Sequence, residues 1–100
     1  MTAGEISEIL RRDPGPVRVR DGDCREFEAV VEDVDSPQEG DLKHIAAHLD
    51  PDDREQIPDG THPMITVAGD RKRGWDAVIV VYYDGTDPYE TGLDELEVVD

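Results

Sequence analysis

Two histidines four residues apart, His44 and His48, are the first residues in this sequence with a spacing that suggests chemistry. On a helix, this spacing places both imidazoles on one face about one turn apart, as in helical metal sites. His62 or an acidic neighbour such as Asp41 would supply a third ligand. However, Ile45 stands where the zinc-protease helix motif has glutamate. Two interpretations follow: a metal-binding protein or metal-dependent enzyme built on His44, His48 and His62, or an exposed pair without function.

A second candidate is the run Arg71-Lys72-Arg73, because it reverses the sign of the charge in a very acidic chain. Together with Trp75, it could hold a phosphate backbone and stack an indole on a base. The same run could equally neutralise neighbouring aspartates. The formal charge of −16 also opposes nucleic acid, so the patch would act against a repulsive field. The sequence assigns binding to Arg71, Lys72, Arg73 and Trp75, with a protein partner as the first interpretation and nucleic acid as the alternative.

Other catalytic signatures are missing from the sequence. Cys24 is the single cysteine, so no internal disulfide can form, which fits a reducing compartment. We interpret it as a surface or half-buried thiol, since no histidine lies close to it in the sequence. The chain contains no glycine-rich phosphate loop, serine nucleophile elbow or Cys-x-x-Cys motif. We therefore expect no cofactor and no catalytic residue, and we favour a non-enzymatic interaction or regulatory domain over an enzyme.

The charge balance indicates where such a domain works. The 26 acidic and 10 basic residues are distributed over the whole length, which favours a folded domain with an acidic surface over a solvated acidic tail. The repulsion within such a surface reaches about 10 Å at 0.1 M salt and about 3 Å at 1 M, which suits a halophilic cytoplasm. The competing interpretation is an acidic binding surface for a basic protein, or a mimic of nucleic acid. The sequence has neither a membrane-length apolar run nor the order of a signal peptide, so we expect a cytoplasmic protein without a membrane partner.

The N-terminal third predicts a helix and a hairpin. Thr2 and Glu5 match a capping box, and apolar residues at helical spacing follow them. Residues 17–20 then alternate between valine and arginine, and a turn joins them to residues 26–34. The expected register pairs apolar residues on one face and opposite charges on the other: Val17 with Ala29, Val19 with Phe27, Arg18 with Glu28, and Arg20 with Glu26.

The remaining residues predict a second helix and three strands. Ser36-Pro37-Gln38-Glu39 resembles another capping box, and the apolar residues that follow suit a helix over 37–49, with a short further turn through Gln56. Strands are expected at 64–67, 75–83 and near 96–99.

One hundred residues have room for one domain, 1–100. The expected fold class is α+β, with one mostly antiparallel sheet of about five strands, an N-terminal helix and a helical insertion between the second and third strands. The order of an aromatic strand, an Asp-Gly turn and a short strand after Trp75 is similar in architecture to SH3-like barrels. That similarity would curl the sheet into a small, partly open barrel.

Overall fold

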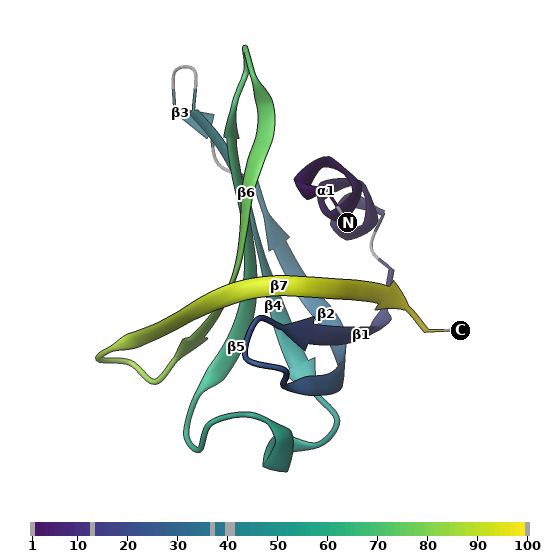
Figure 1. Ribbon diagram of the computed structural model, residues 1–100, viewed down its shortest axis with the longest axis vertical. Helices are drawn as coiled ribbons and strands as arrows, with labels where there is room; N and C mark the ends of the chain where they lie inside the picture. The colour runs from purple at the N-terminus through teal and green to yellow at the C-terminus, as the bar shows by residue number, and fades with distance from the viewer. Residues whose placement is uncertain (1, 13, 37, 40–41, 100) are drawn as a thin grey trace.

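The computed structural model describes residues 2–12, 14–36, 38–39 and 42–99. Its elements, in chain order, are α1 (Ala3–Arg11), β1 (Pro16–Asp21), β2 (Glu26–Asp35), β3 (Gln38–Glu39), β4 (Leu42–Pro51), a 3-10 turn η1 (Arg54–Gln56), β5 (His62–Asp70), β6 (Gly74–Tyr83) and β7 (Pro88–Val98). The sheet order is β2-β1-β7-β6-β5-β4-β3, and β2 also pairs with β4. That additional pairing closes the six long strands into an antiparallel barrel (Figure 1).

The α+β class with an antiparallel sheet is confirmed, and the sheet differs from expectation in size and closure. Six long strands form the barrel where about five were expected, and the barrel is closed where a partly open one was expected. Each barrel strand pairs with its neighbours in the chain, and β7 returns to pair with β1. Closure gives each barrel strand a partner on both sides, which reduces the unpaired sheet edge that would otherwise invite association with another chain.

The β1–β2 hairpin has the register that its alternation predicts. The observed pairs are Val17–Ala29, Val19–Phe27, Arg18–Glu28 and Arg20–Glu26. The four apolar side chains lie in the core, and none is more than 4% exposed. On the outer face, Arg18 forms an ion pair with Glu28 at 3.0 Å. Arg20 forms its ion pair with Glu95 of β7, at 3.1 Å.

The expected helix over 37–49 is wrong: these residues contribute β3 and β4, although Pro37 itself lies outside the described residues. In β4, Ile45, Ala47, Leu49 and Pro51 are buried, with a period of two. A helix would have placed Ala47 on its polar side. The short apolar run fits either period, and pairing with both β2 and β5 selects the strand because it completes the barrel.

The C-terminal strands form as expected, except that the last one is longer. β5 and β6 contain the predicted segments, whereas β7 spans 11 residues rather than a few near Leu96. Its first residues are mostly exposed and show no apolar alternation, so the sequence pattern does not reveal them. β7 pairs with β6 through residues 88–92 and with β1 through residues 93–98. It therefore joins the two halves of the barrel.

Helix α1 begins with the predicted capping box between Thr2 and Glu5. Its residues Ile6 and Leu10 pack into the core, and the helix contacts β6, β5 and β2. Figure 1 shows α1 beside the upper part of the β5–β6 hairpin, whose tip projects beyond the barrel near β3. Within the described residues, no helix has the length and apolar character needed to cross a membrane.

Candidate functional site

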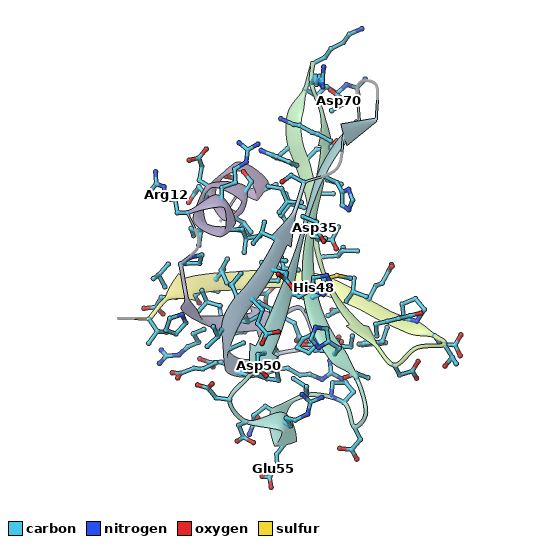
Figure 2. All side chains as sticks on the ribbon, turned by 180° about the vertical axis from the view of Figure 1, so that it is seen from behind. Arg12, Asp35, His48, Asp50, Glu55 and Asp70 are labelled. Atoms are coloured by element: carbon cyan, nitrogen blue, oxygen red, sulfur yellow. The ribbon has the colours of Figure 1, made fainter. Side chains whose placement is uncertain are left out.

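The predicted basic run lies at the tip of the β5–β6 hairpin. Arg71, Lys72 and Arg73 form the turn between the strands, and all three are exposed. The carboxylate of Asp70 accepts hydrogen bonds from the backbone N–H groups of Lys72, at 2.8 Å, and of Arg73. Figure 2 labels Asp70 at this tip. Because a side chain ties the backbone of the turn, the three cations project from a defined loop.

Two glycines are required for this turn. Gly74 has φ +81°, in the left-handed region that glycine adopts without strain. At Gly69, an added Cβ would lie only 2.2 Å from the carbonyl oxygen of Gly74. The pairing register shifts between Ala68 and Gly69, which is the mark of a bulge. The two glycines therefore allow the strands to pack closely beneath the turn of residues 71–73.

Trp75 lies at the base of the tip and holds two further cations. The Nζ atom of Lys43 is 4.4 Å from the centroid of the indole ring, and the guanidinium carbon of Arg11 is 5.8 Å from it. Lys43 pairs with Gly69, and Gly69 pairs with Trp75, so the three residues form a row across β4, β5 and β6. Gly69 contributes no side chain between its neighbours. Both cations are within the range of cation–π attraction.

These residues form one surface, which we call the basic end: Arg11, Lys43, Arg71, Lys72, Arg73 and Trp75. It contains five of the ten basic residues of the chain. The sequence identified four of its six members. It did not identify Arg11 or Lys43, because α1 and β4 approach Trp75 only in the folded state.

The other basic residues have partners elsewhere. Arg18, Arg20 and Arg25 form ion pairs with carboxylates of the barrel and its β1–β2 turn. Arg12 forms an ion pair with Glu8 within α1, and Arg54 donates a hydrogen bond to the carbonyl oxygen of Thr61. These five side chains therefore serve local structure.

The predicted metal ligands are only partly brought together. The imidazole centroids of His48 and His62 are 5.6 Å apart. His44 lies four residues from His48 on the same strand, which corresponds to roughly 13 Å at about 3.3 Å per residue. Within the described part of the chain, no three histidine, cysteine or acidic side chains converge as a metal site. Asp41, the alternative third ligand, lies outside the described residues.

A polar network that the sequence did not predict lies at the β1–β2 turn. Asp21 is fully buried, and its carboxylate accepts the backbone N–H groups of Asp23 and Arg25, both at 2.9 Å. It also accepts the hydroxyl of Tyr82 at 2.6 Å and lies 3.3 Å from the guanidinium of Arg25. Burial, followed by this hydrogen bond to Asp21, raises the pKa of Tyr82 far above its ordinary value.

The network continues to the surface. The hydroxyl of Tyr89 donates to Asp23, and this bond is the main cause of the lowered pKa of Asp23. The guanidinium carbon of Arg25 lies 5.4 Å from the ring centroid of Tyr82 and 5.3 Å from that of Tyr89. Cys24 is exposed in the same turn with φ +69°. We interpret the network as structural, because its groups satisfy one another.

In comparisons with known proteins, no family model, no curated protein and no solved structure matches this chain. Its function is therefore inferred from its own residues.

Proposed function

We propose that this protein is a non-enzymatic interaction domain that binds an anionic partner protein at its basic end. The observation that carries the proposal is that two cations lie over the Trp75 indole and three exposed cations form the adjoining turn, in a chain with a formal charge of −16. Arginine and lysine keep their charge at neutral pH, so the basic end is suited to bind anions rather than to transfer protons.

The basic end is prepared for binding before a partner arrives. The turn is held by Asp70, and the indole restrains Lys43 and Arg11. Less conformational entropy is then lost on association than with freely moving lysine and arginine side chains. The acidic surface elsewhere repels an anionic partner, so the same charge balance directs that partner to the basic end.

A protein partner fits this surface better than nucleic acid does. Two carboxylates, Asp70 and Asp76, flank the basic residues in the hairpin, so the charge there is mixed. Mixed charges with a central tryptophan and arginines are typical of protein–protein binding sites. A continuous row of phosphates would meet the carboxylates as well. The cations over Trp75 also compete with a base that would stack on its ring.

The acidic composition supports a high-salt cytoplasm as the setting, where 26 carboxylates maintain solubility. Screening at about 1 M salt limits electrostatic attraction to about 3 Å. Binding there depends on direct contact of arginine and tryptophan with the partner rather than on long-range attraction.

Fluorescence provides the test, because Trp75 is the only tryptophan in the chain. We would titrate poly-L-glutamate, as an acidic polypeptide, and a DNA oligonucleotide into the protein at low salt. A saturable change in Trp75 emission with poly-L-glutamate is expected, and raising the salt should weaken it.

A matched pair of variants gives the control. The double variant Arg71→Gln/Arg73→Gln should lose the response, whereas Arg18→Gln/Arg20→Gln should keep it, although both carry the same net charge. Equal responses in the two variants, or no response in the wild type, would contradict the proposal. A response to DNA but not to poly-L-glutamate would indicate a nucleic-acid-binding site instead.

A further inference from the structure

The outer face of β4 and β5 carries a histidine pair that takes no part in the basic end. His48 pairs with Met64, so His62, two residues earlier on β5, is its diagonal neighbour. Backbones in that relation are about 7–8 Å apart, yet the two imidazole centroids are 5.6 Å apart, with 34° between the ring planes. The rings therefore lean toward each other. Figure 2 shows His48 well below Asp70, so the pair is separate from the hairpin tip.

We propose that His48 and His62 together bind one divalent transition-metal ion, as a two-imidazole site on the outer face of the barrel. A nitrogen–metal bond of about 2.0–2.1 Å places each ring centroid about 3.2 Å from the ion. Two rings at an angle near tetrahedral are then separated by about 5–6 Å. The observed 5.6 Å lies within that range, so the spacing of the two rings matches that of two imidazoles bound to one ion.

The strands make this pair a chelate rather than two separate ligands. β4 and β5 are paired over seven residues, from Leu42 with Asp70 to His48 with Met64. Both strands belong to the closed barrel. Binding therefore does not need to order the backbone, which lowers the entropic cost of bringing two ligands to one ion.

The donor set determines which ions are suitable. Imidazole nitrogen suits Cu²⁺, Ni²⁺ and Zn²⁺ rather than Mg²⁺ or Ca²⁺, and affinity rises to a maximum at Cu²⁺. Among the described residues no third ligand converges on the pair, so water completes the coordination of the ion. The bound ion would link β4 to β5 and stabilise the folded state.

The test uses CuCl₂ and ZnCl₂ in calorimetric titrations, with excess MgCl₂ to occupy carboxylates. His44→Ala is the matched control, because it removes a histidine from the same face of the same strand. One Cu²⁺ per chain is expected in the wild type and in this control, with weaker binding of Zn²⁺. His48→Ala and His62→Ala should each weaken Cu²⁺ binding by about tenfold or more.

Thermal unfolding provides a second measurement. Excess Cu²⁺ should raise the midpoint of the wild type and of His44→Ala, and should raise it less in His48→Ala and His62→Ala. Equal affinity in all four proteins would overturn the proposal, because the ion would then bind carboxylates. Loss of affinity in His44→Ala equal to that in His48→Ala would overturn it too.

Discussion

Removal of the hydroxyl of Tyr82 tests whether the buried network at the β1–β2 turn stabilises the fold. In Tyr82→Phe, the fully buried carboxylate of Asp21 loses a donor at 2.6 Å. It keeps two backbone N–H groups and the guanidinium of Arg25 at 3.3 Å. The carboxylate therefore keeps part of its hydrogen-bond partners.

The expected cost follows from that geometry. A hydrogen bond to a charged group contributes about 1.5–3 kcal/mol to stability. At a buried site, water does not replace the lost donor, so this contribution is lost in full. Because 1 kcal/mol shifts the melting temperature of a domain of this size by about 4–8 °C, Tyr82→Phe should lower it by on the order of 10 °C. Urea unfolding followed by circular dichroism measures the free energy directly.

Two neighbouring tyrosines provide the controls. Tyr83 is 47% exposed, so Tyr83→Phe should change stability by less than about 0.5 kcal/mol. Tyr89 also bonds a carboxylate, but it is 45% exposed, so Tyr89→Phe should cost clearly less than Tyr82→Phe. Equal losses in Tyr82→Phe and Tyr83→Phe would refute the argument that the buried bond to Asp21 is responsible.

Three further predictions concern pH, packing and salt. Because the folded state raises the pKa of Tyr82, the unfolded chain loses that proton first as the pH rises above about 10. Stability should therefore fall above that pH, and urea midpoints at roughly pH 9–11 should fall less steeply in Tyr82→Phe. Gly69→Ala places its Cβ 2.2 Å from the carbonyl oxygen of Gly74 and should cost roughly 1–3 kcal/mol. Gly92→Ala meets no atom within 4 Å and should cost much less; similar costs for the two variants would contradict the close packing. Raising KCl from about 0.1 M to 2 M should raise the thermal midpoint, because it screens repulsion among 26 carboxylates. A midpoint independent of KCl would favour the acidic surface as a binding site instead of a salt adaptation.

Local chemistry in the sequence was sufficient for α1, for the β1–β2 hairpin and for the cores of β5 and β6. The capping box of Thr2 and Glu5 involves residues only three apart, so its energetics do not depend on the rest of the chain. In the hairpin, the turn at residues 21–25 and the alternation of Val17 and Val19 determine the register, since a slip by one residue would expose the valines.

Tertiary structure decided the conformation of residues 42–51. Their apolar residues fit a helix or a strand, and the choice depends on partners far away in the chain. Ala47 pairs with Val34 of β2 on one side and with Ile65 of β5 on the other. Those pairings satisfy the backbone hydrogen bonds of β4 on both sides and bury its apolar face, which no local pattern can anticipate.

The functional surfaces also divide into parts that the sequence reveals and parts that only the folded structure brings together. The charge reversal at 71–73 and the neighbouring Trp75 are visible in the sequence because they are contiguous. The approach of Lys43 and Arg11 to that indole depends on where β4 and α1 pack. The bond between Asp21 and Tyr82 joins residues 61 positions apart. Side-chain pairs of such long separation arise only in the folded sheet, because β7 pairs with both β1 and β6 and so brings these strands together.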